Sequence, residues 1–373
     1  MRRIARYIHE LKGWPALVWD SGRLSDLLAA LRYRQGKLTG RMEALGFSLR
    51  NEATLQTLTL NVLKSSEIEG DLLNPDQVRS SVARRLGMDI GGLVPSDRHV
   101  DGIVEMMVDA TQNYNRDLSA KRLFDWHAAM FPTGRSGMNK IVVGNWRNNS
   151  TDDPMQVISG PIGKERVHFE APASDRLKYE MKIFIDWFNR TNDIDQVLKA
   201  AVAHLWFVTI HPFDDGNGRV ARAIADMQLA RADNNAQRFY SMSAQIRKER
   251  NAYYQILEKT QRGTLDITQW LEWFLSCLNR ALDATEDTLS EVILRAKFWE
   301  EHGDQQLNAR QKAMLTKLLD HFEGKLTTSK WAKMMKCSHD TALRDIQDLV
   351  DRNILVKDGP GGRSSAYILN PSN

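Results

Sequence analysis

Helix-favouring and apolar residues recur with a helical period along most of this chain. Residues 200–210 form an apolar, helix-like run, and residues 221–230 combine a helical apolar period with high helix propensity. Residues 24–33 have an amphipathic pattern and follow two tryptophans, Trp14 and Trp19, which favours a helix packed by aromatic side chains. The pattern therefore predicts a mainly α-helical protein.

A hairpin interrupts this helical pattern. Residues 155–159 and 166–169 are β-prone, and the stretch between them, 160–164, has the glycine and proline of a turn. The chain then returns to a predicted helix around residues 175–189. We therefore expect two short paired strands here, with His168 as a strand residue and not a metal ligand.

The C-terminal part of the chain predicts a winged helix-turn-helix domain. A strand, a glycine-rich turn and a second strand occupy residues 354–369. Three helices, each preceded by a capping residue, are predicted before them, at 309–321, 329–335 and 339–351. Three successive helices followed by such a wing are typical of this fold.

The chain therefore divides into three predicted domains. Residues 1–90 form an N-terminal helical region, residues 95–300 a helical core with the hairpin, and residues 307–373 the winged domain. The length of 373 residues is enough for two or three domains.

Composition indicates a soluble protein of the reducing cytoplasm. Hydrophobic residues make up 42% and charged residues 26% of the chain, with two cysteines far apart, Cys277 and Cys337. The longest apolar run is too short to span a bilayer, and no apolar segment follows the basic N-terminus. We therefore expect no membrane association and no secretion signal. The net charge of +4 gives no case for nucleic-acid binding by charge alone.

Residues 211–222 contain more potentially catalytic and ligand-binding residues than any other stretch of this length in the chain. They are His-Pro-Phe-Asp-Asp-Gly-Asn-Gly-Arg-Val-Ala-Arg, placed between the two predicted helices at 200–210 and 221–230. Glycines let backbone N–H groups turn toward a ligand, and the N-terminus of the second helix favours an anion. Arg219 and Arg222 are three residues apart, so both can lie on one helix face and bind phosphate oxygens.

The other residues of this stretch suit a nucleotide reaction. Asp215 is a hard oxygen ligand for Mg²⁺, or for Mn²⁺, which could bridge two phosphates. His211 stands just before the loop, where it could take a proton from an attacking hydroxyl group. Each residue alone is also compatible with an ordinary capped helix turn, but the whole ordered set favours catalysis.

The twelve residues resemble the signature of Fic-domain proteins, His-Pro-Phe-x-Asp/Glu-Gly-Asn-Gly-Arg-x-x-Arg, at every fixed position. Most such enzymes transfer AMP from ATP to a protein Ser, Thr or Tyr hydroxyl. The resemblance implies that His211 is the general base and that Asp215 binds the metal. It implies an anchoring role for Phe213 and a γ-phosphate contact for Arg222. The remaining phosphate contacts would come from Gly216, Asn217, Gly218 and Arg219.

A second motif resembles the Fic inhibitory motif, Ser/Thr-x-x-x-Glu-Gly/Asn. Residues 65–70 are Ser-Ser-Glu-Ile-Glu-Gly, within a helical stretch that ends at Gly70. Ser65 and Glu69 are four residues apart and share a helix face. The resemblance implies that Glu69 forms an ion pair with Arg222 in the place of the γ-phosphate, which makes the enzyme self-inhibited. Some relatives also use this glutamate to remove AMP from the modified protein.

The hairpin resembles the Fic flap, which lies over the active site. An extended target segment can pair with an exposed hairpin edge through backbone hydrogen bonds. The docking strand would then contain Met155, Gln156, Val157 and Ile158. By similarity, Tyr254 would line the adenine pocket and Gln261 would face the base, although plain helix packing explains both residues equally well.

The resemblance leaves several alternatives open. The expected partner is a target protein that bears the hydroxyl. This protein could also modify itself by self-AMPylation. A homodimer is expected because relatives often form one. DNA is a further partner through the helix at 339–351, with His339, Thr341 and Arg344 near its start. Lys357 and Arg363 would then touch phosphates. Asp340, Asp345 and Asp348 argue against tight DNA binding, so protein docking is an alternative role for this domain.

The alternative to an enzyme is a DNA-binding transcriptional regulator whose core senses a nucleotide. The complete motif, with His211 and both arginines present, favours the enzyme. Some Fic relatives transfer another nucleotide, phosphate or phosphocholine, but no departure from the motif points to those donors.

Overall fold

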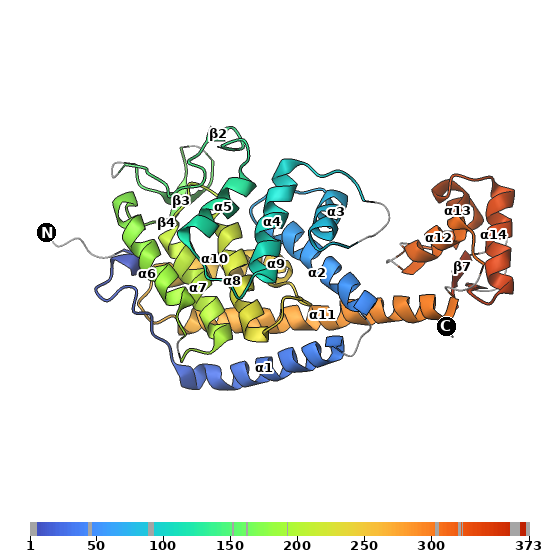
Figure 1. Cartoon of the computed structure of the whole chain (residues 1–373), viewed down its shortest axis with the longest axis horizontal. Helices are drawn as coiled ribbons and strands as arrows, with labels where there is room; N and C mark the ends of the chain where they lie inside the picture. The colour runs from blue at the N-terminus through green and yellow to red at the C-terminus, as the bar shows by residue number, and fades with distance from the viewer. Residues whose placement is uncertain are drawn as a thin grey trace. The chain divides into compact units, whose positions relative to one another are not determined.

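The computed structural model describes residues 6–43, 47–88, 93–150, 153–161, 163–191, 193–302, 306–319, 322, 324–358 and 366–370. They form two compact units, Met1–Asp287 and Thr288–Asn373. The prediction of a mainly helical protein is confirmed (Figure 1). Among the described helices, none is both long and apolar enough to cross a membrane.

The first unit is built largely from helices, with two small hairpins. Its first helices are η1 (Ile8–Glu10), α1 (Ser21–Glu43), α2 (Phe47–Ile68), α3 (Pro75–Arg85), α4 (Arg98–Gln112) and α5 (Ala120–Met130). The hairpins are β1 (Arg135–Ser136) with β2 (Asn139–Lys140) and β3 (Gln156–Ser159) with β4 (Arg166–Glu170). They are followed by η2 (Ser174–Arg176), α6 (Leu177–Asn189), α7 (Gln196–Ile210), α8 (Asn217–Asp233), α9 (Met242–Lys248) and α10 (Arg250–Gln261). Helix α11 (Thr268–His302) begins in the first unit.

Helices α7 and α8 form the centre of the first unit (Figure 1). All residues of α7 from Val197 to Ile210 are buried, which explains why α7 is apolar on most of its surface, and most residues of α8 are buried as well. Asp195 caps α7 by accepting a hydrogen bond from the Val197 amide at 2.7 Å. The short connection between α7 and α8 is therefore held from both sides by rigid, buried helices.

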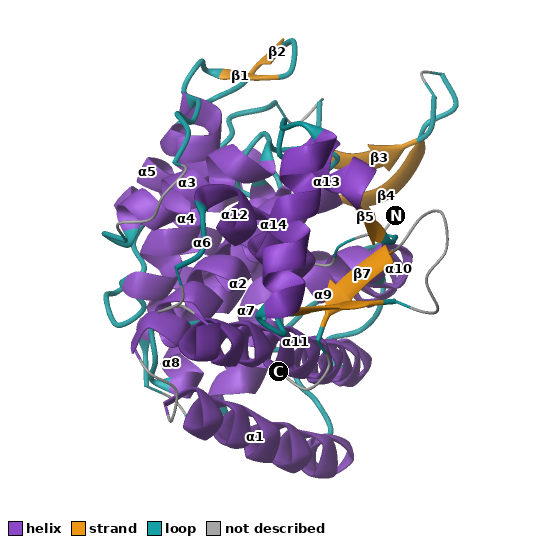
Figure 2. Cartoon of the chain, turned by 90° about the vertical axis from the view of Figure 1, so that its right-hand side faces the viewer, coloured by secondary structure: helices purple, strands orange, loops and turns teal. Residues whose placement is uncertain are grey.

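The hairpin of β3 and β4 is antiparallel, with Gln156 opposite Glu170 and Val157 opposite Phe169 (Figure 2). Phe169 is buried and packs on Tyr7, ahead of η1, with the two ring centroids 5.1 Å apart. Val157 packs against the same small cluster. The N-terminal residues therefore fasten the base of the hairpin to the unit through Phe169, the buried residue of β4.

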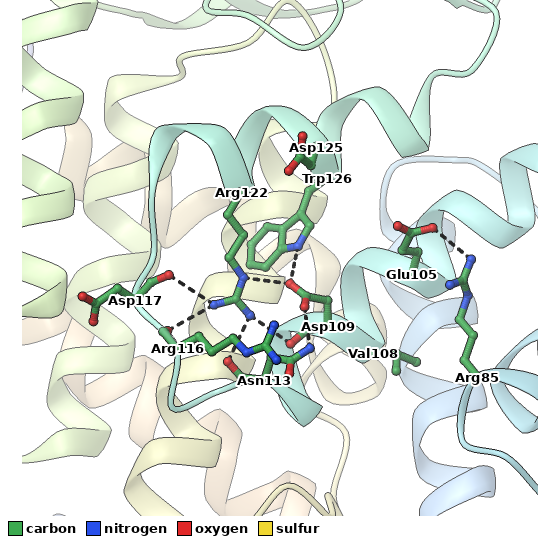
Figure 3. Close-up of a pocket in the computed structure, with 10 residues that line it drawn as sticks. All are labelled: Arg85, Glu105, Val108, Asp109, Asn113, Arg116, Asp117, Arg122, Asp125 and Trp126. Atoms are coloured by element: carbon green, nitrogen blue, oxygen red, sulfur yellow. Dashed lines mark hydrogen bonds and ion pairs between the residues drawn. The ribbon is translucent and has the colours of Figure 1, made fainter.

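A polar cavity of about 590 Å³ lies where α4 and α5 meet (Figure 3). Arg122 on its wall donates hydrogen bonds to the Asp109 carboxylate at 2.7 Å and to the carbonyls of Asp109 and Asn113. Trp126 donates to the same carboxylate at 2.8 Å. Because Arg122 satisfies carbonyl groups at the end of α4, it acts as a side-chain cap and joins α4 to α5.

The second unit has its own core. It contains α12 (Ala309–Leu319), β5 (Leu326–Thr327), α13 (Thr328–Met334), α14 (His339–Asp351), β6 (Leu355–Lys357) and β7 (Ala366–Leu369), with strand order β5-β7-β6. Trp331 and Met314 are fully buried in its centre. Thr327 and Ser338 cap α13 and α14 as the sequence predicts.

Two acidic residues of α14, Asp345 and Asp348, are paired within the unit, whereas the sequence suggested charges that would oppose DNA binding. Asp345 is buried and accepts hydrogen bonds from Arg310 at 2.7 and 3.0 Å, and Asp348 accepts one from Arg352. Their charges are therefore largely compensated within the unit. His339 and Arg344 are exposed on α14, whereas Arg363 lies outside the described residues. DNA binding through α14 stays a prediction.

Candidate functional site

The loop between α7 and α8 carries the predicted catalytic residues on an unusual backbone. His211 ends α7 with φ of 51° and Gly216 precedes α8 with φ of 79°, so both are in the left-handed region. Glycine takes this conformation freely, but for histidine it costs about 1 kcal/mol. A Cβ atom on Gly216 would also lie 3.0 Å from the ring of Phe131. The tight turn therefore requires glycine here and puts strain on His211.

Asn217 closes this loop. Its side-chain Nδ2 donates to the Phe213 carbonyl at 2.7 Å, and its Oδ1 accepts from the Phe213 amide at 2.9 Å. Phe213 is fully buried and stacks on His127 of α5 at a centroid distance of 4.2 Å. The predicted anchoring of Phe213 is confirmed. Because both polar atoms of the Asn217 side chain bind backbone groups, this side chain shapes the loop, and a ligand would meet the Asn217 backbone.

The contacts of His211 define which ring nitrogen is free. Its Nδ1 lies 3.2 Å from the Val208 carbonyl, which assigns the proton to Nδ1 and leaves the lone pair on Nε2. Arg147, itself buried, donates to the His211 carbonyl at 2.8 Å and holds the residue in place. Burial lowers the pKa of His211 to about 4, and the nearby Arg147 charge acts in the same direction. The imidazole is therefore neutral at pH 7 and able to accept a proton.

Two aspartates of the loop have different tasks. Asp214 accepts a hydrogen bond from the Val142 amide at 2.8 Å and so ties the loop to the segment after α5. Asp215 is nearly half exposed, accepts from the Ser136 hydroxyl, and has one oxygen 3.9 Å from Arg219. A partly exposed carboxylate next to an anion cradle suits a single-carboxylate Mg²⁺ site completed by water and phosphate. No cluster of three or more ligating side chains occurs among the described residues.

The start of α8 has unused hydrogen-bond donors. Arg219 and Arg222 are 4% and 2% exposed, yet Nε of Arg219 and Nη1 of Arg222 have no hydrogen-bond partner among the described residues. Buried guanidinium donors are normally satisfied, so an anion is expected to fill this place. A Cβ atom on Gly218 would lie 3.2 Å from Arg222 Nη1 and 2.2 Å from a carboxylate oxygen, so only glycine leaves room here.

That carboxylate belongs to Glu69. Its Oε1 accepts a hydrogen bond from Arg222 Nη2 at 2.7 Å, so the predicted contact between these two residues is present. Ser65 adds two more contacts, because its hydroxyl and its carbonyl both accept from Arg222, at 2.9 and 2.8 Å. Burial opposes the charge of Arg222, but the Glu69 carboxylate outweighs it and raises the pKa. The end of α2 thus engages Nε and Nη2 of Arg222, while Nη1 has no partner among the described residues.

The contacts between α2 and α8 continue beyond this ion pair. Asn61 lies one turn before Ser65 and donates to the buried Asp226 at 2.7 Å. Asp226 also pairs with Arg238 at 3.4 Å, and Asn61 in turn accepts from Ser241. The polar face of α2 therefore follows that of α8 in antiparallel order, which anchors the helix that carries Glu69.

A cavity of about 480 Å³ opens beside His211. Tyr254 and Gln261 of α10 line it together with Glu69 and Gly218. Two residues of the predicted docking strand, Val157 and Ile158, also line it. The other two lie elsewhere: Met155 packs on the cluster around Phe169, and Gln156 donates to Glu170 at 3.0 Å. The hairpin is held to α10 by His168, whose Nδ1 is 2.7 Å from Glu258.

Several residues of the site escape the motif-based prediction. Arg147, His127 and Ser136 come from the segments around α5 and β1, and each contacts a residue of the 211–216 loop. Asp71 and His99 lie beside Arg219, as described below. Buried polar side chains of this kind have no periodic signal, because their partners are far away in the sequence.

Comparison with known proteins agrees with this geometry. Residues 117–229, which include α5, α7 and the whole catalytic loop, match the Fic/DOC family. The chain contains a Fic/DOC domain. Residues 7–88, ahead of that domain, match a domain of unknown function, DUF4172, which here includes α2 and Glu69. Glu69 and the loop between α7 and α8 thus fall in two separately matched regions of the chain.

Relatives with this Fic/DOC domain are distant. The chain is 25% identical over 314 residues to the protein adenylyltransferase Fic of Drosophila yakuba, and 24% identical over 295 residues to that of Drosophila willistoni. These alignments cover 82% and 77% of this chain, but the chain spans only about half the length of these curated relatives, 55% and 54%.

Solved structures support the fold. A Fic family protein from Desulfovibrio desulfuricans superposes with a TM-score of 0.51 at 21% identity, over 92% of this chain and 96% of that one. A Fic domain-containing signaling protein from Bacteroides thetaiotaomicron gives a TM-score of 0.51 at 19% identity, over 71% and 97% of the two chains. The Fic-type helical fold expected from the sequence is therefore present.

Proposed function

We propose that this protein transfers AMP from ATP to a hydroxyl group of a protein, and that Glu69 restrains the reaction. One observation carries the proposal: a neutral histidine with a free Nε2 lines the same cavity as Gly218 at the start of α8, and Gly218 lies beside the unpaired Nη1 donor of Arg222. Nucleotidyl transfer requires at least a general base and, next to it, an anion site large enough for a polyphosphate. The distant similarity to protein adenylyltransferases supports AMP as the transferred group.

ATP would occupy the cavity with its phosphates at the start of α8. The backbone of Gly216, Asn217 and Gly218 and the guanidinium of Arg219 would bind the phosphates, while Arg222 would bind the γ-phosphate. Adenine would lie toward Tyr254 and Gln261, which line the same cavity. Asp215 would hold Mg²⁺ or Mn²⁺, which neutralises phosphate charge when bound.

The reaction follows from this placement. A target hydroxyl reaches the cavity beneath the hairpin, and Nε2 of His211 takes its proton. The oxygen attacks the α-phosphorus, a new P–O bond forms, and the bond to the β-phosphate oxygen breaks to release pyrophosphate. Positioning and the charges of the two arginines supply most of the rate acceleration, because little covalent work falls to the protein.

The acceptor is proposed to be a segment that extends the hairpin sheet. β4 is paired with β3, so the outer edge of β3 can accept a third strand in the two-stranded sheet. Pairing through the backbone makes little demand on sequence and allows a separate target protein or a second copy of this chain to donate the hydroxyl. A homodimer and self-AMPylation both fit this proposal, as does removal of AMP with Glu69 in place.

The position of the label in ATP tests the function directly. Incubation of a Glu69→Gly variant and a cell extract with Mg²⁺ and ATP should label protein when the radioactive phosphate is α, and not when it is γ. AMP transfer retains the α-phosphate and releases the other two. Label from γ-labelled ATP would instead show phosphate transfer, and no label from either would contradict a nucleotidyl transferase that uses ATP.

The pH dependence of the reaction tests the role of His211. Because burial lowers the pKa of His211 to about 4, the neutral imidazole persists well below pH 7. We expect kcat/KM of the Glu69→Gly variant to stay level down to about pH 5 and to fall as the pH passes through about 4. An acidic limb near pH 6.5, the ordinary histidine value, would contradict this assignment. Circular dichroism at each pH separates protonation of the base from unfolding.

A further inference from the structure

The turn after α2 brings a second carboxylate to the phosphate site. Asp71 follows Glu69 by two residues, and its Oδ2 lies 3.2 Å from Nη1 of Arg219. The turn is well defined: Gly70 has φ of 86°, and the Asp71 amide donates to the Ser66 carbonyl at 3.0 Å. Glu69 and Asp71 therefore leave the same helix end and reach the two motif arginines separately.

The guanidinium of Arg219 has few close polar contacts other than Asp71. Its side chain is 5% exposed. Among the described residues, its nearest other carboxylate oxygen is that of Asp215 at 3.9 Å, and its Nε has no hydrogen-bond partner. The ring of Phe131 lies 5.2 Å from its central carbon, a cation–π contact. Asp71 is thus the closest anion to a buried cation whose remaining donor is unused.

His99 of α4 fixes the Asp71 carboxylate in this position. Its Nε2 lies 2.8 Å from the same Oδ2 atom that Arg219 contacts, and its Nδ1 lies 3.0 Å from the Met130 carbonyl. The hydrogen bond from His99 lowers the pKa of Asp71, so the carboxylate is ionised at neutral pH. The same hydrogen bond raises the pKa of His99. Asp71 is therefore a placed negative charge and not a solvated side chain.

We propose that Asp71 is a second inhibitory residue, which occupies Arg219 in place of a non-terminal phosphate of ATP while Glu69 occupies Arg222. This inference rests on the proposed binding of ATP phosphates at α8. Bound phosphate and the Asp71 carboxylate compete for one guanidinium, and their like charges repel. The carboxylate thus weakens the binding of any nucleotide that carries an α- and β-phosphate, including one without a γ-phosphate.

This last property separates the two carboxylates in an experiment. ADP lacks the phosphate assigned to Arg222, so its affinity reports mainly on Arg219, and adenosine lacks phosphates altogether. We would measure the binding of Mg·ADP, Mg·ATP and adenosine by isothermal titration calorimetry for wild type, Glu69→Gly, Asp71→Asn and the double variant. Asp76→Asn is the matched control, because Asp76 is an exposed aspartate five residues further along, in the first turn of α3.

Asp71→Asn is expected to tighten ADP binding about threefold to tenfold, the effect of one partly shielded ion pair, and to leave adenosine binding and the Asp76→Asn control unchanged. Glu69→Gly should act mainly on ATP. Weaker or unchanged ADP binding in Asp71→Asn would overturn the proposal and make Asp71 a support that orients Arg219 for phosphate. Asp71→Ser provides the same test if the amide variant does not fold.

Binding is measured without turnover, so this result does not depend on which group is transferred. If ADP binding tightens in Asp71→Asn but no variant labels protein from α-labelled ATP, the proposed reaction fails and the role of Asp71 stands. If labelling succeeds and ADP binding does not tighten, the proposed reaction stands and the inhibitory role of Asp71 fails.

Discussion

Replacement of Glu69 by glycine should raise the rate of AMP transfer about tenfold to a hundredfold. The Glu69 carboxylate is 2.7 Å from Arg222, a guanidinium that is only 2% exposed, and its Oε1 fills the space above Gly218. A charge-assisted hydrogen bond of this kind is worth about 1.5–3 kcal/mol, and that free energy must be spent whenever ATP displaces it. Removal of the carboxylate therefore frees both the cation and the space for the γ-phosphate.

Glu67→Gly is the control for this change. Glu67 lies in the same helical turn but pairs with Lys64 and Arg247, so its loss removes a glutamate from α2 without freeing Arg222. Initial rates of labelling from α-labelled ATP should rise in Glu69→Gly alone. Equal rates in the two variants, or a lower rate in Glu69→Gly with ATP binding intact, would show that Glu69 does not restrain the enzyme.

Replacement of His211 by alanine in the Glu69→Gly background should lower transfer by about a hundredfold to ten-thousandfold, the usual contribution of a general base. The side chain contacts the protein through Nδ1 and the Val208 carbonyl, while the backbone contacts of residue 211 do not depend on the side chain. ATP affinity and the thermal unfolding temperature should therefore change little.

The control for a lost histidine is His339→Ala, at an exposed position in the second unit. Labelling rates and calorimetric ATP binding, measured on the same preparations, separate loss of chemistry from loss of substrate. Retained transfer in the His211→Ala variant would exclude this residue as the base. Lost transfer together with lost ATP binding would indicate a collapsed loop instead.

The local pattern of the chain was enough to predict several of the helices, including α7 and α8, the hairpin and the chemically active loop. The candidate catalytic and phosphate-binding residues all lie within residues 211–222. Their order alone therefore indicates which face of α8 points at a ligand. The end of α2 was predictable because Ser65 and Glu69 share a helix face and Gly70 stops the helix. These predictions depend on residues near one another in the sequence.

Contacts between distant segments were not predictable in the same way. The position of Asp71 beside Arg219, 148 residues away in the sequence, depends on how α2 and α8 pack together, and His99 joins them from a third helix. The two acidic residues of α14 show the same limit. Asp345 counted as a surface charge by sequence, but Arg310 from α12 neutralises it in the folded unit. A single sequence contains no periodic signal for such pairings.

The anchoring of α2 along α8 has a consequence for how such an enzyme is switched on. Asn61 and the buried Asp226 hold the helix two turns before Glu69, so the inhibitory segment is part of the folded body and not a separable plug. Helix ends, in contrast, fray at a small fraction of the cost of global unfolding. With the proposed role of Glu69, the resting rate would be set by how often the last turn of α2 melts. A single bound molecule that prefers the melted turn would be a sufficient activator, with no movement of the rest of the protein.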